Sequence, residues 1–201
     1  MKKIMFNDKH CLTQAVLERR KTTTRRIVPE SALKKWEIHD KYHNQKDAVG
    51  NRMCFENFLT GYATFKIGEE VAIAQAYKDI EELLPIPSCY DYFQHRQTYH
   101  IYGDTPGWHN KMFVNADLMP HSIKITDIRV ERLQDITHGD CLKEGIGKRG
   151  DAPLDFYIIG DMDVLFDTAK SAFAYLIDQV SGKGTWERNP YVFVYEFELI
   201  M

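Results

Sequence analysis

The chain has 201 residues, of which 44% are hydrophobic, which is enough for one domain with a sizeable core. Lysine and arginine number 26 against 29 aspartate and glutamate residues, so the formal net charge is −3 and sequence-independent coating of nucleic acid is not expected. The sequence has no run of 18 apolar residues and no signal-peptide pattern, which predicts a cytoplasmic protein without a membrane span.

The first predicted helix covers about residues 8–18. Asn7 or Asp8 can begin it, because either side chain accepts a hydrogen bond from a free amide of the first turn, and apolar residues recur behind it at helical spacing. A β-branched stretch then predicts a strand over residues 22–28, which Pro29 ends. A run of lysine and arginine separates the two elements and forms a local basic cluster in an acidic chain.

The middle of the chain is predicted to carry two insertions, at about residues 29–60 and 78–110. Apolar spacing around Trp36 indicates a short helix in the first, and the second is dense in proline and aromatic residues. Between them, residues 62–67 and 70–75 have the composition of two strands joined by a Gly-Glu turn.

The second half alternates between strands and helices. Strands are predicted over residues 122–132 and 191–198, and a helix over 164–180 from its apolar spacing. Thr137 is a good N-cap residue for a short helix that Gly145 ends. The order predicts one α+β domain, with the strands in one closed or nearly closed sheet and the helices around it.

Metal ligands cluster at short spacing in sequence, and no such cluster is found. The eight histidines have no paired spacing, and no pair of cysteines has the Cys-x-x-Cys spacing. Neither a metal nor a cofactor is therefore predicted, and the thiols are expected to be reduced. The four cysteines are Cys11, Cys54, Cys89 and Cys141.

Three segments together resemble the ASCH family, particularly its longer form that bacteriophages and prophages often encode. Residues 17–26 read Leu-Glu-Arg-Arg-Lys-Thr-Thr-Thr-Arg-Arg, similar to the family's G-R-K-T-x-T-R-R signature. Residues 125–136, followed by an acidic helix ending at Glu144, resemble the second conserved segment, and residues 186–197 the third. The order and the spacing of the three segments match those of the family.

The resemblance implies a PUA-like small β-barrel with flanking helices, formed by residues 1–201 as a single domain. It also implies binding of RNA, or of a nucleoside or nucleotide, in a basic and polar cleft. The sequence itself predicts that neither a membrane nor a metal is a partner. Arginine supplies planar paired donors for such a ligand, and aromatic rings stack on bases. The candidate ligand contacts are Thr22, Arg25, Arg26, Trp186 and Tyr191.

Some small members of the family resemble amidohydrolases that remove acyl groups from N4 of cytidine nucleosides with a lysine, a threonine and a glutamate. The matching residues are Lys21, Thr24 and Glu144. Lysine acts as a base only when its surroundings lower its pKa. Since residues 21 and 24 of a regular strand point to opposite faces, this chemistry requires Lys21 to lie at the helix–strand junction. Glu144 would orient the lysine or carry a proton to the leaving amine.

The chain departs from the family pattern at three places. Arg19 stands where the family usually has a glycine, the strand ending near Gln75 lacks an Arg-Glu pair, and residues 111–115 replace a Ser-Ile-His-Met-Pro segment. Three classes of function remain open at this point. They are a nucleic-acid or nucleotide-binding domain, an acyl-cytidine amidohydrolase, and a protein-interaction module of phage or mobile-element origin that uses the aromatic insertion.

Overall fold

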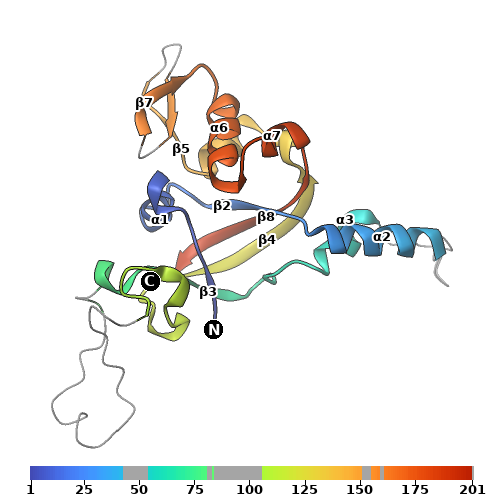
Figure 1. Ribbon diagram of the computed structural model, residues 1–201, viewed down its shortest axis with the longest axis horizontal. Helices are drawn as coiled ribbons and strands as arrows, with labels where there is room; N and C mark the ends of the chain where they lie inside the picture. The colour runs from blue at the N-terminus through green and yellow to red at the C-terminus, as the bar shows by residue number, and fades with distance from the viewer. Residues whose placement is uncertain (43–53, 81–82, 84–105, 151–154, 159–160, 201) are drawn as a thin grey trace, which may run out of the picture.

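The computed structural model describes residues 1–42, 54–80, 83, 106–150, 155–158 and 161–200. Within these residues the fold is mixed α+β, as predicted, with eight strands in two sheets and helices around them (Figure 1). No helix of this part of the chain is both long enough and apolar enough to cross a bilayer.

The larger sheet contains the four strands that the sequence predicts around residues 22–28, 70–75, 122–132 and 191–198, which confirms that they share one sheet. Its order is β1-β3-β4-β8-β2, with β1 parallel to β3 and the other pairs antiparallel. Along the described chain this sheet is open, with β1 and β2 at its edges, so the predicted closed or nearly closed barrel is not confirmed. The strands are β1 (Lys2–Ile4), β2 (Thr23–Ile27), β3 (Glu70–Ile73), β4 (Ser122–Arg132) and β8 (Tyr191–Ile200).

The long pair of β4 and β8 forms the centre of the molecule. The two strands pair over almost their full length, with one irregularity between Ile125 and Asp127. β8 is buried on both faces in its middle, because Val194 and Tyr195 are both fully covered. This explains the unbroken apolar run over residues 191–195, which is typical of a strand with packing on both sides.

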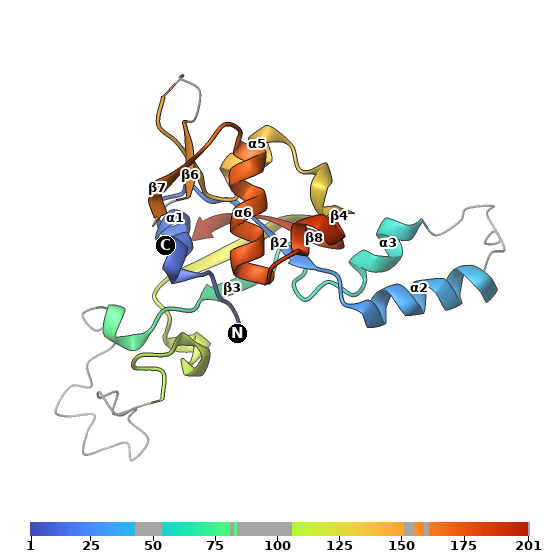
Figure 2. The same ribbon diagram turned by 45° about the horizontal axis from the view of Figure 1, so that its top comes forward.

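The smaller sheet and four helices complete the core. The sheet has the order β5-β6-β7, and α6 packs against it and against α5 and α7 (Figures 1 and 2). These elements are β5 (Ile146–Lys148), β6 (Phe156–Ile158), β7 (Asp161–Phe166), α5 (His138–Lys143), α6 (Ala169–Ser181) and α7 (Thr185–Arg188). The fourth helix, α1 (Leu12–Leu17), precedes β2.

The structure corrects the bounds of two predicted helices. The helix expected over residues 8–18 is divided at Cys11, whose left-handed backbone (φ 51°) separates a 3-10 turn capped by Asn7 from α1. The helix expected over 164–180 begins only at Ala169, because the residues up to Phe166 belong to β7 and Thr168 is the N-cap.

The strand expected over residues 62–67 is wrong, since this segment forms turns and bends. Its amides donate to nearby backbone carbonyls, as at Tyr62 and Ala63, or to side chains, instead of to a neighbouring strand. The Thr64 N–H donates to the Tyr195 hydroxyl at 3.0 Å, and the Lys66 N–H donates to a carboxylate oxygen of Glu69 at 2.8 Å. Local hydrogen bonds therefore determine the conformation of residues 62–67, although their composition favours a strand.

The first predicted insertion is largely helical. It holds α2 (Glu30–Tyr42) and α3 (Phe55–Thr60), which extend to one side of the main sheet (Figure 1). Trp36 joins them, with edge contacts to Phe55 at 5.4 Å and Phe58 at 5.2 Å between ring centroids. Most aromatic residues of the second insertion lie outside the described residues, namely Tyr90, Tyr92, Phe93, Tyr99 and Tyr102.

Candidate functional site

The basic cluster lies where the chain leaves α1 and enters β2. Arg19 takes a left-handed conformation (φ 60°), and the amides of Arg20 and Lys21 both donate to the carbonyl of Ala15. Lys21 therefore lies at the helix–strand junction and outside the pleat of β2, as the proposed chemistry requires.

The end of α5 is held against this junction. The Thr22 amide donates to the Lys143 carbonyl at 2.9 Å, and Gly145 follows with φ 100°. A β-carbon at Gly145 would make only ordinary contacts, 3.4 Å from Leu12 and 3.7 Å from the β-carbon of Lys21, so glycine is favoured by its positive φ in this close approach of the chain to the junction. The approach brings Glu144, the last residue before this glycine, to Lys21.

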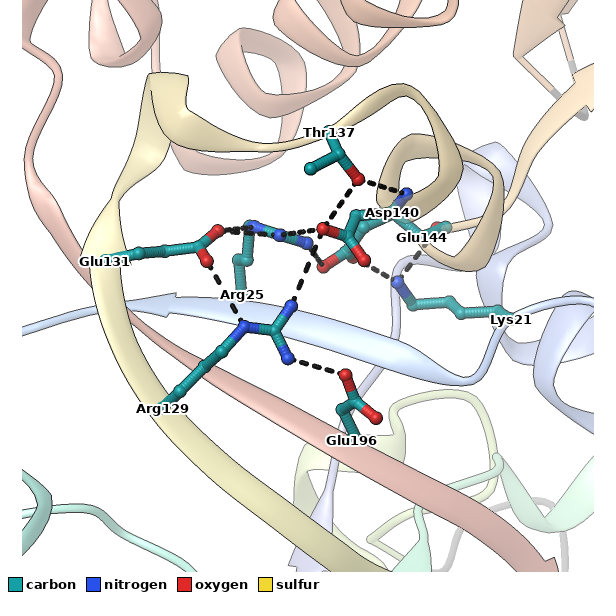
Figure 3. Close-up of polar contacts among 8 residues, drawn as sticks. All are labelled: Lys21, Arg25, Arg129, Glu131, Thr137, Asp140, Glu144 and Glu196. Carbon is teal, nitrogen blue, oxygen red and sulfur yellow. Dashed lines mark hydrogen bonds and ion pairs between the residues drawn. The ribbon is translucent and has the colours of Figure 1, made fainter.

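Lys21 and Glu144 form a buried ion pair. The lysine Nζ lies 2.5 Å from Oε2 of the carboxylate and also donates to the Glu144 backbone carbonyl at 2.9 Å (Figure 3). The side chains are only 2% and 5% exposed. Burial lowers the pKa of the Lys21 amine below that of a free lysine, and the neighbouring carboxylate opposes this shift.

Arg25 holds the other oxygen of Glu144. Its Nη1 donates to Oε1 of Glu144 at 2.9 Å, so the carboxylate lies between the lysine and the arginine (Figure 3). The same guanidinium contacts Oε1 of Glu131 through Nε at 3.1 Å and Nη2 at 2.7 Å. Asp140 is 3.7 Å from Nη2. The position of Glu144 is thus fixed by charged groups on both of its sides.

A pocket of about 400 Å³ opens onto this pair. Five polar side chains from β2, from its junction with α1 and from the end of α5 line it, and the lining residues of α6 and of the segment after β1 form a mostly apolar side. These five are Lys21, Thr24, Arg25, Arg26 and Glu144, and Asn7 and Ser181 are further polar lining residues on the other side. The structure therefore brings the three predicted catalytic residues and two of the predicted ligand contacts to one cavity.

The other three predicted ligand contacts do not line this pocket. The backbone of Thr22 forms hydrogen bonds with the backbones of Lys143 and Phe197. Trp186 lies edge-on to Phe173 with ring centroids 6.2 Å apart, and Tyr191 lies under the Arg132 guanidinium at 3.7 Å. Both rings have partners within the chain, and base stacking by either stays a prediction.

Sequence reasoning missed the outer part of the charged network. Arg129 contacts Glu131 at 3.2 Å, Glu196 at 2.5 Å and Asp140 at 3.6 Å. The sequence spacing could have predicted this contact, because Arg129 and Glu131 are charged residues two apart on a strand and must share one face. The apolar side of the pocket was also missed, since the apolar stripe of α6 reads equally well as core.

The buried cysteine next to the site is not a competing nucleophile. Burial raises the pKa of the Cys141 thiol to about 11, which makes it a poor nucleophile. Among the described residues, no group of three histidine, cysteine, aspartate or glutamate side chains is arranged to hold a metal ion.

Comparisons with known proteins do not assign the chain to a family. No family model, no curated protein and no solved structure matches it. The chemistry of the pocket therefore carries the functional argument.

Proposed function

We propose that the chain is a small amidohydrolase that binds a nucleoside-sized ligand and removes the acyl group from an N4-acylated cytidine. The observation that carries this proposal is that Lys21, Thr24 and Glu144 line one pocket around a buried lysine–carboxylate contact. The ASCH resemblance supports it, since it assigns these three residues to this chemistry. It also supports a PUA-like relationship for the main sheet.

The proposed reaction has two steps. The neutral Lys21 amine takes the proton of the Thr24 hydroxyl, and Oγ1 forms a bond to the acyl carbon of the amide. The carbon–nitrogen bond then breaks as the leaving nitrogen receives that proton from the lysine. A water molecule hydrolyses the resulting threonine ester, releases the carboxylic acid and restores the hydroxyl. The sum is amide plus water to amine plus acid.

The surroundings of Lys21 suit both of its charge states in this cycle. Burial favours the neutral amine that acts as the base. Glu144 accepts hydrogen bonds from the amine through its carboxylate and its backbone carbonyl, so it orients the nitrogen and stabilises the ammonium after proton transfer. Glu144 is therefore a positioning and electrostatic group.

The charge and the size of the pocket favour a small ligand over a nucleic-acid strand. Its volume of about 400 Å³ lies at the lower end of the range for small-molecule sites. The charges of Lys21 and Arg25 are already neutralised by ion pairs with Glu144 and Glu131. Few uncompensated cations are left to displace counterions from a phosphate backbone.

Binding without hydrolysis is the second candidate function. Arg26 favours it, because this residue lines the pocket beside Arg25 and could contact a phosphate or a base edge. Salt-dependent binding of RNA or a nucleotide, with no turnover of an acylated nucleoside, would select this function.

Turnover of N4-acetylcytidine to cytidine tests the first proposal. Thr24→Val keeps the shape but removes the nucleophile, so turnover should fall at least about a thousandfold, whereas Thr24→Ser should retain activity. Thr23→Val is the matched control, because Thr23 is the neighbouring buried threonine and does not line the pocket. No cytidine from the wild-type protein at high concentration would contradict the proposal.

Changes to the ion pair test the base. Lys21→Ala should abolish turnover, and Glu144→Gln should lower it, since the amide keeps the shape but loses the charge. Breaking a buried pair costs about 3–5 kcal/mol of stability, so each variant needs a thermal denaturation curve at the assay temperature. Folded Lys21→Ala protein with wild-type turnover would exclude the lysine as base.

A further inference from the structure

Three exposed apolar side chains meet at the mouth of the pocket. Met5, Ile27 and Val180 line it and are 40%, 42% and 39% exposed. They come from separate elements, namely the segment after β1, the end of β2 and the end of α6. We call these three residues the apolar rim. Exposed apolar side chains that gather at one cavity mark a binding surface more often than scattered ones do.

α6 connects the rim to the interior. Phe173, Leu176, Ile177 and Val180 are spaced by three, one and three residues, which places them on one face of the helix. All four line the pocket, and the first three are buried. The α6 wall of the pocket is therefore apolar from Phe173 to Val180, with Ser181 as its polar outer end, and Figure 2 shows α6 beside the main sheet.

The deep part of the pocket has the opposite character. Lys21 and Glu144 are buried there and charged, and Arg25 lies beside them. A ligand that satisfies both parts must present polar groups to the interior and an apolar group to the rim.

We infer that the apolar rim binds the acyl group of the substrate and that the site prefers aliphatic acyl groups longer than acetyl. This inference rests on the proposed hydrolysis. The leaving nitrogen must receive its proton from the buried Lys21, so the amine half of the amide lies on the deep side of Thr24. The acyl half then points outward, towards Met5, Ile27 and Val180.

A series of N4-acylcytidines tests this orientation. Acetyl, butyryl and hexanoyl substrates should show kcat/KM rising about two- to fourfold for each added methylene, the range expected from burying a methylene partly or fully. A 4-hydroxybutyryl substrate is the matched control for butyryl, because it is similar in length but polar at its end. The kcat/KM of the 4-hydroxybutyryl substrate should therefore be no higher than that of the acetyl substrate.

Two neighbouring residues of α6 supply the matched variants. Val180→Ser should flatten the dependence on chain length, because it makes the rim polar. Gln179→Ser, at an exposed residue that does not line the pocket, should keep the wild-type slope. Equal kcat/KM across the series, or an unchanged slope in Val180→Ser, would overturn the inference while leaving the hydrolysis intact.

Affinity separates the two proposals. Calorimetry with the Thr24→Val protein should show tighter binding of hexanoyl- than of acetylcytidine. If no substrate is turned over by the wild-type protein but this order of affinity is found, the hydrolysis is wrong and the apolar rim as the acyl site stands. If none of the series binds, the rim inference is overturned as well.

Discussion

Arg19 ends α1 in a left-handed conformation, with φ at 60°. This conformation costs a residue with a β-carbon roughly 1 kcal/mol, and glycine avoids most of that cost. Arg19→Gly should therefore raise the free energy of unfolding by about 0.5–1 kcal/mol in urea denaturation. Arg19→Ala keeps the β-carbon and serves as the control, and an equal gain in that variant would show that loss of the charged side chain was responsible.

Thr23 is a second residue whose chemistry conflicts with its surroundings. It is buried on β2, and its hydroxyl has no hydrogen-bond partner in the described structure. A buried hydroxyl without a partner costs about 1–3 kcal/mol, and valine has the same shape and a good strand propensity. Thr23→Val should raise the thermal midpoint, whereas a lower midpoint would mean that the hydroxyl is satisfied in solution.

α5 is the short element that delivers Glu144 to the site. Thr137 caps it, with its side chain accepting from the Asp140 amide at 3.1 Å. Thr137→Ala should cost about 1 kcal/mol of stability and should lower turnover more than binding, because Glu144 loses its fixed position. Thr137→Ser keeps the cap and should restore both properties. A stability loss with unchanged turnover would separate α5 from the chemistry.

The turn between α6 and α7 depends on one carboxylate. Asp178 accepts hydrogen bonds from the amides of Trp186 at 2.8 Å and Gly184 at 2.9 Å, and these bonds lower the pKa of Asp178. Since the folded pKa lies below the unfolded one, the stabilisation is present at neutral pH and is lost as pH falls through the lowered pKa. Denaturation curves between pH 7 and pH 2 should show a smaller acid-induced loss for Asp178→Asn than for wild type. Equal losses would contradict this role.

Much of the whole fold is readable from the sequence, because local pattern and tertiary packing agree there. β2, β4 and β8 are rich in β-branched or aromatic residues, and packing on the sheet reinforces that preference. The cap at Thr137 and the stop at Gly145 were predicted for the same reason, since each needs only its near neighbours.

The remaining features depend on partners that are far away in the sequence. β1 has only three residues and exists through its pairing with β3, and the segment near Thr64 bonds to Tyr195 instead of forming a strand. In the site, the resemblance supplied Lys21 and Glu144 as candidates. That they touch across 123 positions follows only from the fold.

The pH dependence of kcat/KM for N4-acetylcytidine tests the central claim, that a buried lysine acts as the base at this pocket. The neutral amine is the active form, so the rate should rise with pH along a single ionisation whose apparent pKa lies below the 10.5 of an exposed lysine. Glu144→Gln removes the charge that opposes this shift and should move the profile to still lower pH. A rate that does not change with pH over the folded range, or no detectable hydrolysis at any pH, would contradict the account.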